Sequence, residues 1–216
     1  MYERLKIIAE LKTPLIMRGF LTFDALMGAL LFEKYEDVDK AHSEIPIKCN
    51  DGLFSASAAQ LEEFTRGGVS FIAGLRADHD IDADLLLKDK TGTKIHRQMK
   101  RTKREAFGNV KNDYITLNSP KVFWEVEGDA DRIDDLLRNA MFIGKKRTSG
   151  YGEVIKWDFE DTSSDGLLDT NNQPLRPIPV HLYKGDKSLP IIDAAWKPAY
   201  WNPENRSACY APRMLA

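Results

Sequence analysis

A strand, a helix and a glycine-rich loop follow one another in KVFWEVEGDADRIDDLLRNAMFIGKKRTSGYGEV, residues 121–154. Alternating apolar side chains at Val122, Trp124 and Val126 predict a strand over 121–127 with one buried face. Asp129 is placed to cap a helix. The apolar stripe of that helix has helical spacing and comprises Ile133, Leu136, Leu137, Ala140 and Met141. We expect Gly144 at the C-terminal stop of this helix.

The N-terminal part of the chain follows the same order. Apolar residues alternate from Leu5 to Leu11, which predicts a strand. Apolar residues at helical spacing then follow Thr22, a candidate N-cap, and comprise Phe23, Leu26, Met27, Leu30 and Leu31. Candidate middle strands lie at 69–75 and 114–118, with a weaker one at 85–87. Two strand–helix units with further strands predict an α+β, ferredoxin-like (RRM-like) sheet over residues 1–159.

Two further segments do not fit this pattern. Residues 77–113 are too many for a hairpin turn, so we expect an insertion there. Seven of the ten prolines follow residue 173, and such a segment is unsuited to helices and central strands. The extension over 160–216 also contains Trp196, Tyr200, Trp201 and Tyr210. Aromatic residues of this kind predict an extension that wraps over the domain or contacts a neighbour.

The composition narrows the class of protein. Of 216 residues, 43% are hydrophobic and 30% are charged, which is typical of a globular chain. No apolar run is long enough to span a membrane, and no signal peptide is recognised at the N-terminus, so we expect a cytoplasmic protein. Two cysteines cannot form a disulfide framework or a four-cysteine zinc site, and the four histidines are scattered. We therefore expect no metal and no cofactor.

The net charge of −2 hides a basic middle segment. Residues 91–156 carry 14 Lys and Arg against 9 Asp and Glu, and six of the eleven residues at 94–104 are cationic. Such a run repels itself unless an anion is near, which favours a polyanion as partner. The alternative is a solvated face. The candidate RNA-binding residues of this run are Lys94, His96, Arg97, Lys100, Arg101, Lys103 and Arg104.

The glycine-rich loop is the second candidate site. Exposed backbone N–H groups beside three cations would form a phosphate cradle, and Tyr151 could stack on a base or a ribose. The alternative is a helix stop followed by a tight turn with solvated lysines. The loop lacks the spacing of a P-loop or of a dinucleotide fingerprint. The candidate RNA-binding residues here are Lys145, Lys146, Arg147, Ser149, Gly150, Tyr151 and Gly152.

These elements together resemble the RAMP superfamily of CRISPR-associated proteins. The resemblance rests on the loop at 144–154 behind the helix at 129–141, and on the opening strand followed by Thr13-Pro14. The tail, with WKPAYW at 196–201 and Cys209, resembles the Cas-five-like subunit of type IV effector complexes.

This resemblance implies a non-catalytic RNA-binding subunit that caps the 5′ handle of the crRNA. It implies a Cas-seven-like backbone subunit and a large subunit as partners, and target DNA reached through the ribonucleoprotein complex in antiviral defence. It assigns the glycine-loop residues to the handle and the 94–104 run to a thumb-like insertion.

Two other functions remain open. One is a metal-independent endoribonuclease that processes CRISPR repeat RNA, with His96, Tyr151 or Lys146 as acid or base. The other is an unrelated α+β domain that binds a ligand or a protein, in which the basic run only aids solubility.

Overall fold

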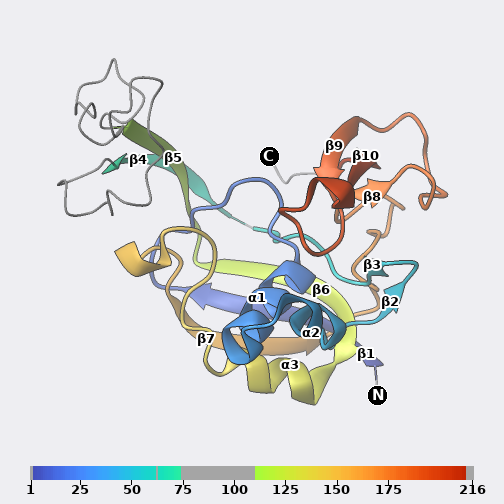
Figure 1. The fold of residues 1–216 in the computed structure, drawn as a ribbon, viewed down its shortest axis with the longest axis horizontal. Helices are drawn as coiled ribbons and strands as arrows, with labels where there is room; N and C mark the ends of the chain where they lie inside the picture. Colours follow the sequence, from blue (N-terminus) through green and yellow to red (C-terminus); the bar gives the residue numbers. More distant parts are fainter. Residues whose placement is uncertain (1, 62, 74–109, 213–216) are drawn as a thin grey trace, which may run out of the picture. The chain divides into compact units, whose positions relative to one another are not determined.

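The computed structural model describes residues 2–61, 63–73 and 110–212 of the chain (Figure 1). It is a mixed α+β protein with mostly antiparallel sheets. The chain divides into two units, one comprising Met1–Arg66 and Thr116–Ala216, the other Gly67–Ile115. The basic run at 94–104 and the weak strand at 85–87 lie outside the described residues. The division proposed at residue 160 stays a prediction.

The central sheet is antiparallel and has β1 in its middle. β1 (Tyr2–Leu11) pairs with β6 (Lys121–Asp129) on one side and with β7 (Val154–Asp161) on the other. Residues 47–60 run along the outer edge of β6, to which they are joined by three isolated bridges. The spatial order is thus 47–60, β6, β1, β7. The strands predicted at 5–11 and 121–127 are confirmed.

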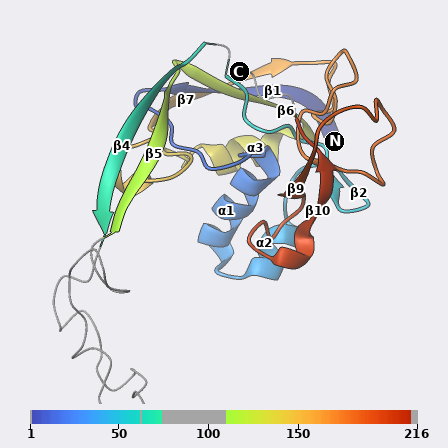
Figure 2. The same cartoon turned by 90° about the horizontal axis from the view of Figure 1, so that it is seen from above.

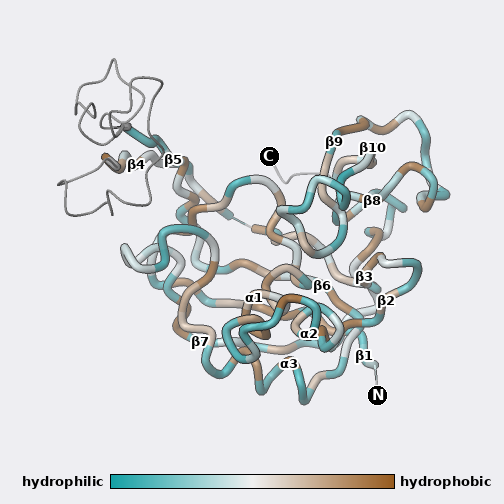
Figure 3. The backbone as a smooth tube through the Cα atoms, viewed as in Figure 1, coloured by the Kyte–Doolittle hydropathy of each residue, from teal (hydrophilic) through white to brown (hydrophobic). Residues whose placement is uncertain are grey.

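Three helices lie against this sheet, and Figure 2 shows them on one face. They are α1 (Phe23–Tyr35), α2 (Val38–Ser43) and α3 (Ala130–Leu137). The core between helices and sheet is apolar, with Ile7, Phe23, Trp124 and Ile133 fully buried. Figure 3 shows hydrophilic residues over the outer turns of α3, as expected for a helix that buries one stripe.

The ends of the helices differ in part from the prediction. Asp129 caps α3 as expected, since its carboxylate accepts from the Arg132 N–H at 3.2 Å. Thr22 precedes α1, but its hydroxyl donates to the Tyr200 hydroxyl instead of capping the helix. α3 ends at Leu137 rather than at Met141, because the chain beyond it bonds to the start of β7 through Val154 N–H and the Met141 carbonyl. Gly144 is therefore not a helix stop.

The candidate middle strands exist among the described residues, but they do not belong to the central sheet, where the prediction placed them. β4 (Thr65–Ala73) and β5 (Val110–Asn118) pair with each other in a two-stranded sheet of their own. The rings of Phe71 and Tyr114 meet edge to face, with centroids 5.7 Å apart. An alternating apolar pattern specifies a strand but not the neighbour with which it pairs.

The remaining elements are short. β2 (Cys49–Asn50) and β3 (Leu53–Phe54) form a small hairpin. In the tail, β8 (Ile178–Pro179), β10 (Arg206–Tyr210) and β9 (Ile191–Ala195) form a sheet in that order. Two 3-10 helices cover Arg147–Ser149 and Pro203–Asn205. Trp196 and Tyr210 are buried in the core of the tail, whereas Trp201 is exposed.

Candidate nucleic-acid interface

The glycine-rich loop joins the segment after α3 to β7 and is closed at its base by backbone hydrogen bonds. The Ile143 N–H donates to the Gly152 carbonyl at 2.9 Å, and the Gly152 N–H donates to the Pro14 carbonyl at 2.9 Å. The Lys12 N–H donates to the Glu153 carbonyl at 2.9 Å. The loop is thereby fixed to the end of β1, because β1 ends where its antiparallel neighbour β7 begins.

Three glycines of the loop have positive φ, but for different reasons. A Cβ at Gly152 would lie 2.0 Å from the Ile143 carbonyl oxygen, and one at Gly144 would lie 2.6 Å from that of Ile16. A Cβ at Gly150 would meet nothing within 4 Å, although φ is +83° there. Two glycines are therefore required by close approach of the backbone, and the third by its conformation alone.

Only part of the predicted phosphate cradle is left open for an anion. Five backbone donors of the loop already donate to carbonyl oxygens of this chain, namely those of Lys145, Ser149, Gly150, Tyr151 and Gly152. A backbone donor that is satisfied inside the fold gives little to a ligand. An anion at this loop would therefore meet fewer backbone donors than predicted, together with the cationic side chains.

The cationic side chains of the loop differ in their surroundings. Lys145 is exposed, and its ammonium has no partner in the described part of the chain. Arg147 makes an ion pair of 3.1 Å with Glu33 of α1. Lys146 and Tyr151 are half-buried and take part in contacts within the protein. Ser149 is exposed. The loop therefore presents Lys145 most openly, with Arg147 partly neutralised.

A groove of about 200 Å³ lies beside the loop, and we call it the glycine-loop groove. Its walls come from residues 16–21, from the Ala25 and Ala29 side of α1, and from residues 142–147. Arg18 lies on its wall, is exposed, and has no ionic partner in the described part of the chain. Three cations, Arg18, Lys145 and Arg147, thus surround one groove.

Sequence reasoning missed Arg18. A prediction that β1 and β7 are antiparallel neighbours would have indicated it, because the loop after β1 and the loop before β7 then lie at the same end of the sheet. Arg18 stands next to Gly19, whose φ is +73°, in that first loop. Of the predicted residues of the glycine-rich loop, Lys145 and Arg147 line the groove, whereas the lining does not include Lys146, Ser149, Gly150, Tyr151 and Gly152. The predicted residues of the 94–104 run lie outside the described residues.

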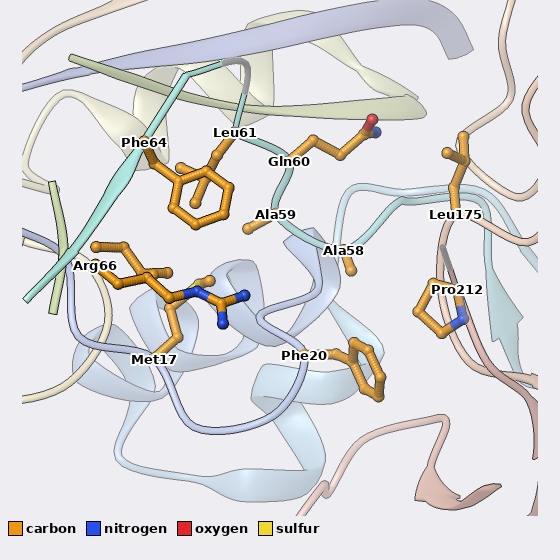
Figure 4. A pocket seen from close by; sticks show the side chains of 11 residues that line it. Met17, Phe20, Ala58, Ala59, Gln60, Leu61, Phe64, Arg66, Leu175 and Pro212 are labelled. Atoms are coloured by element: carbon orange, nitrogen blue, oxygen red, sulfur yellow. The ribbon is translucent and has the colours of Figure 1, made fainter. Parts of the chain in front are cut away.

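A smaller apolar pocket of about 80 Å³ adjoins this groove (Figure 4). Met17 and Phe20 line both hollows, so the two are neighbours. Phe64 and Arg66 also line the pocket, and the guanidinium lies 5.8 Å from the Phe64 ring centroid. Cations beside an apolar, aromatic pocket are the combination that binds phosphates and unstacked bases of single-stranded RNA.

A buried ionic cluster fixes the tail to α1, and no sequence pattern predicted it. Arg176 and Asp24 are both fully buried and pair at 3.0 Å. The guanidinium also donates to the Trp196 carbonyl at 2.7 Å and to the Tyr200 hydroxyl at 2.8 Å. The Tyr200 hydroxyl donates in turn to Asp24.

Burial governs the titration of this cluster. Burial opposes the charge of Arg176, but Asp24 and Tyr200 keep the pKa of the guanidinium above its ordinary value. Burial also raises the pKa of Tyr200 far above its ordinary value, despite the opposing charge of Arg176. The cluster is therefore a structural ion pair with a protonated tyrosine.

Nothing in the described part of the chain forms a metal centre. No group of three or more His, Cys, Asp or Glu could hold an ion among the described residues. Cys49 and Cys209 are not disulfide-bonded, and burial raises the pKa of each thiol. His96, the candidate acid or base, lies outside the described residues.

Comparison with known protein families identifies the family of the chain. The family model for CRISPR type IV associated protein Csf3 matches residues 89–212. The chain belongs to this family. Membership in the Csf3 family implies a role in a multi-subunit type IV complex. No curated protein matches the chain. None of the described helices is both long and apolar enough to cross a membrane.

Proposed function

We propose that this chain is a non-catalytic RNA-binding subunit of a type IV complex that holds the 5′ handle of the guide RNA in the glycine-loop groove. The observation that carries the proposal is the meeting of Arg18, Lys145 and Arg147 around one groove in a member of the Csf3 family. Cations on a rigid loop bind phosphates without needing to order the backbone first.

The arrangement of the central sheet supports a related structural proposal. We propose that this sheet and its helices form a ferredoxin-like domain, and the order 47–60, β6, β1, β7 with the helices on one face supports that proposal. In this interpretation β4 and β5 belong to a long insertion between the second and third strands of the domain. The insertion would supply the thumb-like segment with the basic run at 94–104, and the RAMP resemblance would hold.

The apolar pocket next to the groove gives the proposal a second support. A single-stranded RNA could lay its phosphates along the three cations and place one base against Phe20 and Phe64. Double-stranded nucleic acid offers no free base for such a pocket. The proposal therefore favours the single-stranded handle over a duplex.

Fluorescence anisotropy with a labelled handle RNA tests the site, at salt concentrations between about 50 and 200 mM. Arg18→Glu combined with Lys145→Glu is expected to make the negative slope of log K against log salt shallower by about 1.4, since each phosphate contact on a single strand contributes about −0.7. Lys184→Glu combined with Lys187→Glu, in the exposed loop between β8 and β9, is the matched control. Equal slopes for the two double variants would refute this site.

The contribution of the insertion is tested separately. Replacing Lys100, Arg101, Lys103 and Arg104 by alanine is expected to weaken RNA retention, because a thumb-like insertion that contacts the RNA would lose cations that pair with phosphates. Unchanged retention would favour the unrelated α+β domain.

Catalysis is tested by incubating the protein with repeat RNA in EDTA. We expect intact RNA. Specific cleavage that disappears in His96→Ala would replace the present proposal by the endoribonuclease.

A further inference from the structure

A second groove lies on the other side of α1 and has no part in the proposed RNA site. It has a volume of about 320 Å³ and runs between α1, α2 and residues 198–201. Its floor is made of small residues of α1, Ala25, Gly28 and Ala29. Small residues on a helix face leave room for another chain to approach closely. We call this hollow the acidic groove, for the charges described below.

Large apolar side chains stand exposed along the acidic groove. Trp201 is 77% exposed, Phe32 45% and Val38 39%, and all three line the groove. Exposing one such residue is ordinary for a protein surface, but three around one hollow form a patch of the kind that marks an interaction site. Tryptophan is also the residue most enriched among interface hot spots.

The exposed tryptophan is held on a rigid support. Its neighbour Tyr200 is tied to Asp24 and Arg176 in the buried ionic cluster. The turn is closed by the Asn202 N–H and the Asn205 amide, which donate to the Ala199 carbonyl at 3.0 and 3.2 Å. Because the backbone of this turn is already fixed, it loses little freedom when a partner binds to Trp201. The turn is therefore suited to docking.

The charges beside the apolar residues indicate the chemistry of the partner. Glu36, Asp37 and Asp39 are exposed and lie close in sequence to Phe32 and Val38, although they do not line the groove itself. None forms an ion pair within the described residues, and the Asp37 carboxylate accepts from the Lys40 N–H at 2.9 Å at the start of α2. The two lysines of this stretch, Lys34 and Lys40, instead lie over the Tyr35 ring, at 5.4 and 4.3 Å from its centroid. Three acids against two lysines leave a small net negative charge beside the groove, which favours a segment that carries cations over a nucleic acid.

We infer that the acidic groove binds a segment of another protein subunit of the type IV complex, apolar on one side and carrying Lys or Arg beside it. The apolar side would cover Trp201 and Phe32, and the cations would meet Glu36 and Asp39. This inference goes beyond the proposed function and holds whether or not the glycine-loop groove binds RNA.

A photo-crosslinking amino acid at position 201 tests the inference in the complex co-expressed with its other subunits. The expected product joins position 201 to another subunit, in a peptide with apolar residues and at least one Lys or Arg. The same amino acid at Ile191, an apolar residue of β9 that is 54% exposed, is the control and should give no such product. A product with RNA or with a second copy of this chain, or no product above the control, would overturn the inference.

A binding measurement adds a second readout with the crosslinked subunit as the probe. Trp201→Ser is expected to weaken its binding about tenfold or more, because exposed interface tryptophans are often hot spots. Asp39→Lys is expected to slow association at low salt and to have less effect at high salt. Both substitutions are on the surface, so RNA binding should stay unchanged. A loss of RNA binding with subunit binding intact would overturn the inference.

Discussion

The two sides of α1 present opposite surfaces, although the same small residues separate them. Ala25 and Ala29 line both the glycine-loop groove and the acidic groove. On one side stand Arg18, Lys145 and Arg147. On the other stand acids and exposed aromatic residues. If both proposals hold, α1 would separate an RNA surface from a protein surface, and the opposite charges would help each surface to repel the partner of the other.

The two grooves are also built in different ways. The glycine-rich loop is held by backbone hydrogen bonds at close approach, which tolerate no side chain at Gly152. The wall of the acidic groove is held by side chains distant in sequence, in the cluster of Asp24, Arg176 and Tyr200. Each groove therefore has its own weak point, and substitutions can remove one while leaving the other.

The largest effect is expected for Asp24→Ala, which leaves the fully buried charge of Arg176 without its partner. We expect a loss of about 3–5 kcal/mol in the free energy of unfolding, measured by urea titration. The control is Asp193→Ala, whose ion pair with Arg206 is on the surface and should contribute less than about 1 kcal/mol. Similar losses for both variants would mean that the cluster does not hold the tail.

The next effect concerns the other groove. Gly152→Ala is expected to cost about 2–4 kcal/mol, because the new Cβ meets the Ile143 carbonyl at a positive φ. Gly150→Ala shares the positive φ but has open space, so we expect about 1 kcal/mol. Thermal or urea unfolding of the two variants separates the cost of the steric clash at Gly152 from the cost of the positive φ, which both positions share. Equal costs would show that the close approach is absent.

A smaller effect is expected at high pH. Burial raises the pKa of Tyr200 above its ordinary value of 10.0, so above pH 10 the unfolded chain releases a proton that the folded chain keeps. Stability is then complete below pH 10 and falls as the pH rises, by up to about 1.4 kcal/mol per pH unit. Tyr200→Phe should make this slope shallower, whereas Tyr2→Phe, at an exposed position, should leave it unchanged; the two thiols, whose pKa values are also raised, keep part of the slope in both variants. An unchanged slope in Tyr200→Phe would contradict the assignment.

The smallest effect distinguishes the two sides of α1 directly. Glu33→Gln removes the acid that pairs with Arg147 and should tighten RNA binding about two- to fivefold. Glu36→Gln, on the side of the acidic groove, should leave RNA affinity unchanged. The measurement is the anisotropy titration at low salt. Equal shifts would mean that RNA does not distinguish the two sides.

Much of the fold could be predicted from local patterns. The strands at β1 and β6, the start of α1 and the Asp129 cap of α3 follow from alternation, helical spacing and capping chemistry. The end of α3 could not, because bonds between Met141 and Val154 replace helical ones. The pairing of β4 with β5 could not either, since a strand pattern does not name its neighbour.

The candidate site divides in the same way. Local sequence patterns were enough to locate the glycine-rich loop and its cations between a helix and a strand, because those residues are contiguous. Three other features depend on the tertiary structure. Arg18 lies beside the loop, and five backbone donors of the predicted cradle donate to carbonyl oxygens of the chain. Arg176 is buried against Asp24, which is 152 residues away in the sequence. Contacts of this kind depend on which strands are neighbours and on which residues pair with a buried charge. Local periodicity predicts neither of these.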